Sequence, residues 1–333
     1  MKANKSKSPT LEDVARVAGL SAMTVSRALN NPSVVKEATL NKVKSAVEST
    51  GYIPNKAAGA LASSKSGLIG VVVPQINNSM FVETVEALRG CLAQRGYHVL
   101  LSVSDYSSEN EVDIISSLMS HRPDGIVLTG VHHDNRLKKI ILNSSVPVVE
   151  IWDSTPTPID MLVGLSHDKI GEAIGYEITK KKPKHVGLIW AEDSRAQKRL
   201  QEIIKVLKQK NIKHTVTQVP SPAKIQSGRT GMQILLATEH DFDVIACSSD
   251  TLAQGCIAEA HKQNMKVPDD FSVIGFGDLD VAEYNVPSIT TVNIDRIGMG
   301  QRAANMLADR IEGKLPENPI VNLEFTFKHR ESF

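Results

Sequence analysis

Cysteine is scarce in this chain of 333 residues, which contains Cys91, Cys247 and Cys256 and no others. No two of them stand in a C-x-x-C spacing, so the sequence predicts neither a disulfide framework nor a structural zinc site. No stretch approaches the roughly 18 apolar residues that cross a membrane, and the polar, lysine-bearing residues 1–9 do not resemble a signal peptide. We therefore expect a cytoplasmic protein with no membrane partner.

The sequence also lacks the motifs of common catalytic sites, namely a Gly-x-Ser-x-Gly elbow, a P-loop and a zinc-type His pair. Residues 298–303 match the G-x-G-x-x-A dinucleotide fingerprint, but a helical period of apolar residues runs across them from Ile297 to Ile311. We expect instead that Asp295 caps this helix and that the glycines allow close packing. The sequence thus predicts a protein that is not an enzyme, with no metal and no cofactor.

Charge is distributed unevenly along the chain, although the formal net charge is only +1. Residues 1–65 carry ten Lys and Arg against four Asp and Glu, and the remaining residues carry 28 against 33. The head is therefore basic and the body acidic. A basic head attracts polyanions such as nucleic acids, and an acidic body does not.

The basic head has the pattern of three short helices. Thr10 can cap a helix over residues 11–18 that ends at Gly19, and Ser21 can cap a second over 22–29. A third helix, from about 37 to 49, has apolar residues spaced to pack on the first two. Two short helices joined by a glycine turn, with a third as support, form a helix-turn-helix unit. The alternative is a merely solvated polar face, which the charge of the head disfavours.

Side chains on the second helix suit contact with DNA. Arg27 can donate two hydrogen bonds to a guanine edge, and Met23 or Ala22 can touch a thymine methyl group. Short polar side chains suited to phosphate oxygens, which fix register rather than sequence, are those of Ser21, Thr24, Asn30 and Thr39.

From residue 67 onward, short β-branched runs alternate with amphipathic helical stretches. We expect a first set of strands at 71–73, 99–101, 126–128 and 148–151, and a second set at 161–163, 186–189, 216–219, 244–246 and 273–276. Two successive runs of β-α units indicate two parallel sheets covered by helices. Ligands of such sheets bind at the carboxyl ends of the strands, here in the cleft between two lobes.

Several separated segments resemble the lac repressor family of transcriptional regulators, in the order that the family has them. They are residues 11–15, 21–27, 51–55, 68–74, 124–127, 267–276 and 290–292. The resemblance covers essentially the whole chain. It implies an all-α helix-turn-helix headpiece followed by a two-lobed, doubly wound α/β sensor of the periplasmic-binding-protein type.

The expected domain limits are 1–54 for the headpiece, 55–66 for a hinge helix, and 67–333 for the effector-binding and dimerisation domain. Within that domain we expect one lobe at about 67–156 and 293–318, and the other at about 157–290 and 319–333. The resemblance implies that the chain crosses between the lobes three times, near 155–160, 285–293 and 315–322.

By position, the resemblance implies base contacts from Ala22, Met23 and Arg27, and phosphate contacts from Thr10, Ser21, Thr24, Ser26, Asn30 and Tyr52. Lys36 stands where the family commonly caps its third helix with Ser; lysine is a poor cap, but it could reach a phosphate. The segment from Asn55 to residue 64 matches a hinge helix in which Leu61, flanked by Ala58 and Ala62, enters the minor groove. The alternative is a flexible linker.

The resemblance also implies a set of effector contacts. Asn77, Ser79 and Phe81 follow the first strand, and Arg195 matches an arginine that grips the effector and could hold a carboxylate. Asp250 has capping of the next helix as its alternative role, and Asp278 is displaced by one position from the family's Asp. Residues 74–81 and 147–154 resemble the gluconate repressors within the family, so Glu150 and Asp153 are candidate hydroxyl acceptors. His132 and His133 could also reach the cleft.

We therefore expect a repressor that binds a pseudo-palindromic double-stranded operator as a homodimer and responds to a small sugar-derived molecule, such as gluconate or its phosphate. A helix face with Val85, Leu88, Arg89 and Leu92 is a plausible dimerisation surface. The sequence leaves open a protein corepressor, a purine or a neutral sugar in place of the sugar acid. A transport receptor would share the body but has no use for a basic trihelical head.

Overall fold

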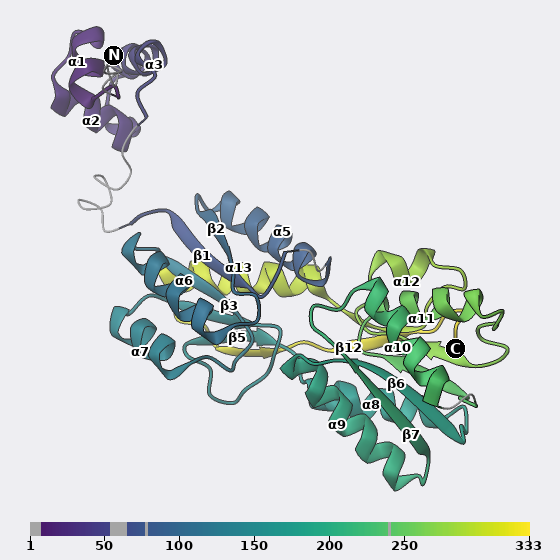
Figure 1. Ribbon diagram of the computed structural model, residues 1–333. Coiled ribbons are helices and arrows are strands. Elements are labelled where there is room, and N and C mark those ends of the chain that lie inside the picture. Colours follow the sequence, from purple (N-terminus) through teal and green to yellow (C-terminus); the bar gives the residue numbers. More distant parts are fainter. Residues whose placement is uncertain (1–7, 54–64, 77–78, 239–240) are drawn as a thin grey trace, which may run out of the picture. The chain divides into compact units, whose positions relative to one another are not determined.

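The computed structural model describes residues 8–53, 65–76, 79–238 and 241–333. The chain divides into two compact units, Met1–Ser66 and Gly67–Phe333, here called the headpiece and the body (Figure 1). Within the described residues, no helix has the length and apolar character needed to span a membrane. Nor do these residues include a cluster of His, Cys, Asp and Glu side chains that could hold a metal ion.

The headpiece consists of helices α1 (Leu11–Ala18), α2 (Ala22–Asn30) and α3 (Glu37–Thr50), with a 3-10 turn at Pro32–Val34. Its small core is formed by two buried residues from each helix: Val14, Ala15, Val25, Ala28, Val43 and Ala46. The apolar spacing in the sequence thus brings the three helices together as expected.

Local sequence fixes the ends of these helices. The Thr10 hydroxyl accepts from the backbone of Asp13, whose carboxylate accepts in return from the Thr10 backbone N–H. Gly19 ends α1 with φ 66°, a left-handed conformation that glycine adopts without steric cost. Ser21 then caps α2 by accepting from the Thr24 backbone. Lys36 precedes α3 and makes no side-chain capping bond, as its residue type predicts.

The first sheet of the body is parallel and has six strands in the order β11-β5-β4-β3-β1-β2. The strands are β1 (Leu68–Val73), β2 (His98–Val103), β3 (Gly125–Thr129), β4 (Val148–Ile151), β5 (Met161–Gly164) and β11 (Ile320–Asn322). Helices α5 (Ser79–Gln94) and α13 (Arg296–Ile311) cover one face, and α6 (Ser108–Ser120) and α7 (Asn135–Ser144) cover the other. Along β1, Val71 and Val73 therefore pack on the first pair and Val72 on the second.

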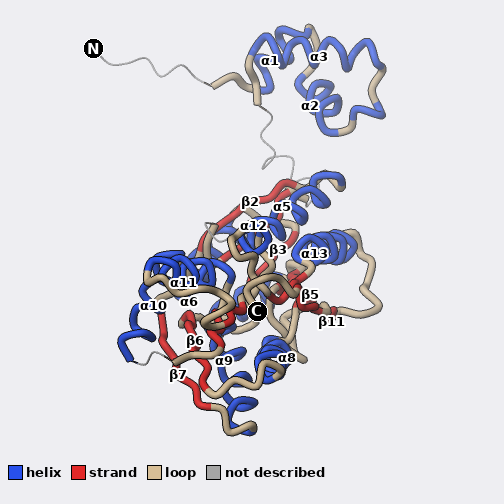
Figure 2. Tube along the Cα trace, turned by 90° about the vertical axis from the view of Figure 1, so that its right-hand side faces the viewer, coloured by secondary structure: helices blue, strands red, loops and turns tan. Residues whose placement is uncertain are grey.

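The second sheet has the parallel order β7-β6-β8-β9, with β6 (His185–Ala191), β7 (Lys213–Val219), β8 (Val244–Cys247) and β9 (Ser272–Ile274). An antiparallel pair, β10 (Thr291–Ile294) and β12 (Phe325–Lys328), extends it through bridges from Ile274 to Thr290 and from Gly277 to Asn293. The helices of this lobe are α8 (His167–Thr179), α9 (Ser194–Gln209), α10 (Ile225–Thr238), α11 (Asp250–Lys262) and α12 (Asp280–Tyr284) (Figure 2).

The two-sheet architecture confirms the predicted fold class, but three assignments of chain to lobe are wrong. Strand β5 belongs to the first sheet, where it pairs with β4, and not to the second. Strand β11 also pairs with β5, whereas residues 319–333 were all expected in the other lobe. Strand β10, at the edge of the second sheet, includes residues assigned to the first lobe. The chain therefore crosses between the lobes after Gly164, Ile294 and Asn322.

The reason for the error lies in the link between β4 and β5. Residues 152–160 contain no helix, although a parallel crossover usually carries one. A count of alternating strands and helices therefore places the change of lobe one strand too early.

The glycine pair near residue 300 serves helix packing rather than nucleotide binding. Asp295 caps α13 by accepting from the Gly298 backbone at 2.8 Å. At Gly300 an added Cβ would lie 2.3 Å from the Thr84 carbonyl oxygen of α5, so α5 and α13 touch backbone to backbone. Both observations agree with the capping and packing roles predicted for this segment.

Gly300→Ala should destabilise the body by about 1–3 kcal/mol, because the extra methyl group forces α5 and α13 apart. Gly90→Ala on α5, where an added Cβ meets nothing within 4 Å, should instead be neutral or stabilise by about 0.5–1 kcal/mol. Urea unfolding followed by the fluorescence of Trp152 and Trp190, both in the body, measures the two effects. Equal stability of the two variants would contradict the close packing.

Candidate functional site

The headpiece presents one polar face of α2 to solvent. Met23 is 72% exposed, and Arg27 is also exposed and has no ion-pair partner among the described residues. Ala22 is half-buried beside them. An exposed methionine beside a free guanidinium offers a surface for a thymine methyl group and two donors for a guanine edge.

The predicted phosphate contacts lie around this face. The Ser21 and Thr24 hydroxyls are 2.9 Å apart, and Asn30 donates to the Ser26 hydroxyl at 3.3 Å. Thr10 is exposed before α1, Thr39 lies in the first turn of α3, and Tyr52 packs on the headpiece core. The predicted contacts Asn55, Ala58, Leu61 and Ala62 lie outside the described residues, as does Asn77 of the predicted effector set.

The body contains two adjoining hollows between its lobes, at the carboxyl ends of both sets of strands. In each sheet the strand order reverses at one place, between β1 and β3 and between β6 and β8, which is where ligands of open α/β sheets bind. Tyr106 and Arg195 line both hollows.

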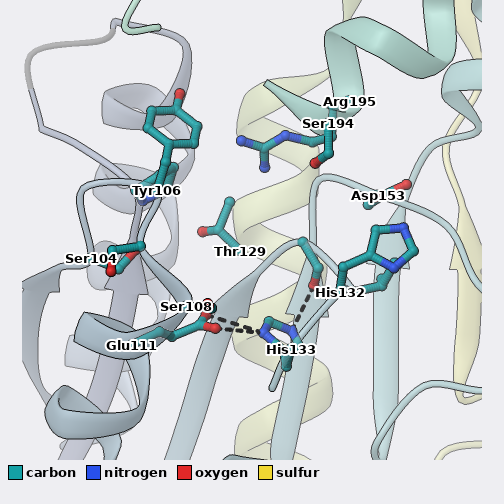
Figure 3. A pocket seen from close by; sticks show the side chains of 14 residues that line it. Ser104, Tyr106, Ser108, Glu111, Thr129, His132, His133, Asp153, Ser194 and Arg195 are labelled. Carbon is teal, nitrogen blue, oxygen red and sulfur yellow. Dashed lines mark hydrogen bonds and ion pairs between the residues drawn. The ribbon is translucent and has the colours of Figure 1, made fainter. Parts of the chain in front are cut away.

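We call the hollow that contains Phe81, Trp152, His167, Arg199 and Phe276 the arginine hollow. The other, which contains Ser104, Ser107, Ser108, Glu111, Thr129, His132, His133 and Asp153, is the hydroxyl-rich hollow (Figure 3). Residues from both lobes line each one, so a ligand there would touch both.

Arg195 reaches the junction of the hollows from the start of α9 (Figure 3). Its guanidinium lies over the Phe81 ring at 5.3 Å, and Phe81 packs edge-on against Trp152 at 5.5 Å. No carboxylate pairs with Arg195 among the described residues. The structure thus brings Arg195 and Phe81, both predicted effector contacts, to the same cavity.

Arg199 is a fully buried cation in the arginine hollow. It donates to His167 Nδ1 at 2.9 Å and to the Ser248 carbonyl at 3.0 Å, and its guanidinium lies 3.8 Å from the Phe276 ring centre. Burial lowers the pKa of Arg199 to about 10, so the side chain keeps its proton at neutral pH. The sequence did not suggest Arg199, because only the fold shows that its side chain is buried and that it pairs with no carboxylate among the described residues.

His167 beside it must be neutral. Burial, and then the charge of Arg199, hold the pKa of His167 well below its usual value. Because Arg199 can only donate, Nδ1 of His167 is the acceptor and Nε2–H donates to the Trp152 carbonyl at 2.9 Å. The neutral imidazole therefore holds the Arg199 guanidinium in position but does not compensate for its positive charge.

Two buried donors in the arginine hollow have no hydrogen-bond partner. They are Nε of Arg199 and Nε1 of Trp152, two of the three buried polar side-chain atoms without a partner among the described residues. Most buried donors in folded proteins are paired, and an unpaired one costs about 1–3 kcal/mol. These two donors and the neighbouring guanidinium of Arg195 could be satisfied by hydrogen-bond acceptors, above all anionic ones.

The hydroxyl-rich hollow ends on an acid–imidazole cluster. His133 Nδ1 donates to both carboxylate oxygens of Glu111, at 3.0 and 3.1 Å, and Nε2 donates to the Gly130 carbonyl at 3.0 Å with Glu150 at 3.4 Å. Burial alone would lower the pKa of His133, but its bonds to Glu111 and Glu150 outweigh burial and raise the pKa to about 9. His133 is therefore a charged clamp for Glu111.

Several predicted effector contacts have other partners. Asp153 lines the hydroxyl-rich hollow, but Lys198 of α9 donates to both its oxygens, at 2.9 and 3.0 Å. Glu150 lines neither hollow: it is buried against His133 and accepts from the Ile159 backbone at 2.6 Å. Ser79, the first residue of α5, is exposed and lines neither hollow.

Asp250 and Asp278 also lie outside both linings. Asp250 accepts from the Thr291 hydroxyl at 2.6 Å and the Leu279 backbone at 2.8 Å, and Ser249, not Asp250, caps α11. Asp278 pairs with Arg330 at 2.7 Å. Both carboxylates thus tie β-strand ends of the second lobe together, a role that their positions after strands do not reveal.

The free energy of unfolding of Asp250→Asn, relative to that of the wild type, should increase as pH rises. Burial raises the pKa of Asp250 to about 6 despite its hydrogen bonds, above the ordinary value of 3.8. Folding then favours the protonated form, so the carboxylate carries a penalty that is absent at low pH, grows as pH rises from about 4 to about 6, and levels off above that at about 3 kcal/mol. Urea unfolding at pH 4.5 to 7.5 measures it, with the exposed Asp269→Asn as control. A difference between Asp250→Asn and wild type that does not change with pH would contradict this penalty.

Comparison with known proteins places both units in one family. Residues 10–55 match the family of bacterial regulatory proteins of the lacI type, and residues 177–333 match a periplasmic binding protein-like domain. The HTH-type transcriptional regulator GntR of Pseudomonas aeruginosa is 32% identical over 327 residues, 97% of this chain and 95% of that protein.

Solved structures agree with this assignment. A LacI family transcriptional regulator from Silicibacter pomeroyi has a TM-score of 0.91 and 29% identity, covering 97% of this chain and 99% of that one. The transcription regulator GntR from Chromobacterium violaceum has a TM-score of 0.76 and 29% identity, covering 80% and 98%. With its helix-turn-helix headpiece and two-lobed α/β body, this chain belongs to the LacI family of DNA-binding transcriptional regulators, which are not enzymes.

Proposed function

We propose that this regulator is a repressor whose operator affinity is controlled by a sugar acid, such as gluconate, bound between the lobes of the body. Two features of the described residues carry the effector class: the unpartnered donors Arg199 Nε and Trp152 Nε1, and the absence of a carboxylate paired with Arg195 or Arg199. A ligand carboxylate supplies both the missing charge and the missing acceptors.

The rest of the cavity suits the polyol part of such an acid. The hydroxyl-rich hollow offers serine, threonine and tyrosine hydroxyls, the His132 imidazole and the Glu111 carboxylate, all of which exchange hydrogen bonds with ligand hydroxyl groups. The sequence segments 74–81 and 147–154, which resemble those of gluconate repressors, contribute Pro74, Phe81, Trp152 and Asp153 to the two linings. Cavity chemistry and resemblance therefore favour the same ligand class.

The competing effectors fit less well. A neutral sugar or a neutral purine leaves Arg195 and Arg199 without an anion, and the buried charge then remains uncompensated. A protein corepressor does not reach Arg199, which is 4% exposed.

We further propose that two copies of the chain bind a pseudo-palindromic operator, with Arg27, Met23 and Ala22 of each α2 at base edges. The hydroxyl and amide side chains of Thr10, Ser21, Thr24, Ser26, Asn30, Thr39 and Tyr52 would contact phosphates. One headpiece offers few base contacts, and pairing on twofold half-sites is how helix-turn-helix proteins gain specificity.

Exposed apolar side chains support pairing through the body. On the first lobe, Leu100 and Leu101 lie on the edge strand β2, and Val82 is exposed on α5. Leu88 and Leu92, which the sequence suggested for this surface, are fully buried against the sheet instead. An exposed apolar edge strand is a liability for a monomer and is satisfied by a second copy.

The ligand would act by changing how the lobes are held. Helix α9 of the second lobe carries Arg195, which lies over Phe81 of the first lobe, and Lys198, which donates to Asp153 of the first lobe. Arg199 of the same helix lines the arginine hollow together with Trp152 of the first lobe. A ligand can shift the balance between two lobe arrangements only by its differential affinity for them. We propose that the acid favours the arrangement that releases DNA.

Arg27→Ala should weaken binding to a selected operator by about 1–3 kcal/mol, because a bidentate guanine contact is lost. Arg16→Ala removes an equal charge from α1, where Arg16 pairs with Asp13, and should reduce operator and random-DNA binding alike. Fluorescence anisotropy on both DNAs at fixed salt measures the ratio of affinities. An unchanged ratio for Arg27→Ala would remove Arg27 from base recognition.

Arg195→Gln should weaken gluconate binding to the full-length protein by tenfold or more, since charge-assisted hydrogen bonds contribute about 1.5–3 kcal/mol. Lys205→Gln, at an exposed position on the same helix, should bind gluconate like the wild type. Isothermal titration calorimetry gives the affinities, with glucitol as the ligand that lacks the acid. Equal binding of gluconate and glucitol would sink the sugar-acid proposal.

A further inference from the structure

The two hollows differ in the charge that they present to a ligand. The arginine hollow has Arg195 and Arg199, and the acidic residue on its lining, Asp193, has its carboxylate engaged in capping α9 through the Ala196 backbone. The hydroxyl-rich hollow ends on the carboxylate of Glu111. The cavity is thus cationic at one end and acidic at the other.

No donor from the acid–imidazole cluster is left for a ligand. His133 donates Nδ1–H to Glu111, and it donates Nε2–H to the Gly130 carbonyl with Glu150 close by. Its side chain is 2% exposed, whereas that of Glu111 is 11% exposed on the cavity lining (Figure 3). The cluster therefore shows the ligand a carboxylate held in a fixed position.

The other charged groups that line the hydroxyl-rich hollow do not make it cationic. Asp153 is a second carboxylate, and its partner Lys198 already donates to both its oxygens. Arg195 stands at the junction with the arginine hollow. Among the described lining residues, His132 adds an exposed imidazole, and hydroxyl groups come from Ser104, Tyr106, Ser107, Ser108, Thr129 and Ser194.

We infer that Glu111, held by His133, determines the polarity of the effector, which here means which end of the bound ligand carries the charge. The carboxylate of the ligand lies at Arg195 and Arg199, and its far end is a neutral hydroxyl terminus that donates to Glu111. A diacid, or an acid phosphorylated at its far end, is rejected. This assignment rests on the proposed sugar-acid function and narrows it to unphosphorylated monoacids.

The physical reason is the difference between a hydroxyl group and a second anion at the same place. A hydroxyl donates to Glu111 in a charge-assisted hydrogen bond. A carboxylate or phosphate there has no hydrogen to donate to the Glu111 oxygens, and it finds no donor in the cluster, because both N–H groups of His133 are engaged. Such a mismatch is how sites discriminate against near relatives of their ligand. Ligands with the same carbon chain length should therefore differ in affinity according to the charge at their far end.

Calorimetric titration of the full-length protein with gluconate, glucarate and 6-phosphogluconate at fixed pH and salt tests this assignment. Glucarate adds a carboxylate, and 6-phosphogluconate a phosphate, at the far end of the gluconate chain. We expect both to bind at least tenfold more weakly than gluconate. Glu111→Gln should reduce the preference for gluconate over glucarate, measured as the ratio of the two affinities, by at least tenfold. Glu109→Gln, at an exposed position in the first turn of the same helix, should leave the ratio unchanged.

The outcomes separate the two proposals. Wild-type binding of glucarate or 6-phosphogluconate as tight as that of gluconate overturns the polarity assignment and leaves the sugar-acid function standing. Equal effects of Glu111→Gln and Glu109→Gln overturn the role of Glu111, because a general change of charge would then suffice. Failure of all three acids to bind overturns both proposals. If Glu111→Gln does not fold, the wild-type ratios decide.

Discussion

The buried guanidinium of Arg199, which pairs with no carboxylate among the described residues, is the constraint on which the proposed function of the body depends. Burying a charge is costly unless partners compensate for it. Hydrogen bonds to His167 and the Ser248 carbonyl, stacking on Phe276, and the nearby charges of Asp193 and Asp153 offset that cost for Arg199. The donors Arg199 Nε and Trp152 Nε1 have no partner among the described residues, and both residues line the arginine hollow, so we propose that a ligand bound there restores the stability that the unpaired donors cost.

This constraint connects sensing to the arrangement of the lobes. Helix α9 carries three cations within five residues, and they meet an aromatic ring, a carboxylate and the hollows at the strand ends of the other lobe. An anion bound there touches both lobes, so its binding energy depends on how they are arranged. The headpiece contributes the face of α2 that we propose reads DNA, where Met23 and Arg27 are exposed and lie outside the headpiece core.

Local features of this chain were predictable from sequence, and features that depend on distant contacts were not. Thr10, Gly19 and Ser21 act through residues at most a few positions away, and the structure confirms the helix ends that they predict. The lobe of β5 depends on pairing with β4 across a helix-free link, which no local pattern encodes. Asp250, Asp278 and Glu150 follow or lie within strands, which is why the sequence suggests them as effector contacts, but in the fold internal donors engage their carboxylates. The sequence did not suggest Arg199 and Glu111, which we propose as effector contacts, because their burial and their positions on the cavity lining exist only in the fold.

The most direct test of the account is fluorescence anisotropy of the full-length protein on a selected palindromic operator, titrated with gluconate at fixed salt and with glucitol as the uncharged counterpart. The account predicts that gluconate weakens operator binding by tenfold or more, whereas glucitol has no effect. Operator affinity that stays the same in saturating gluconate would contradict the link between the arginine hollow and DNA release.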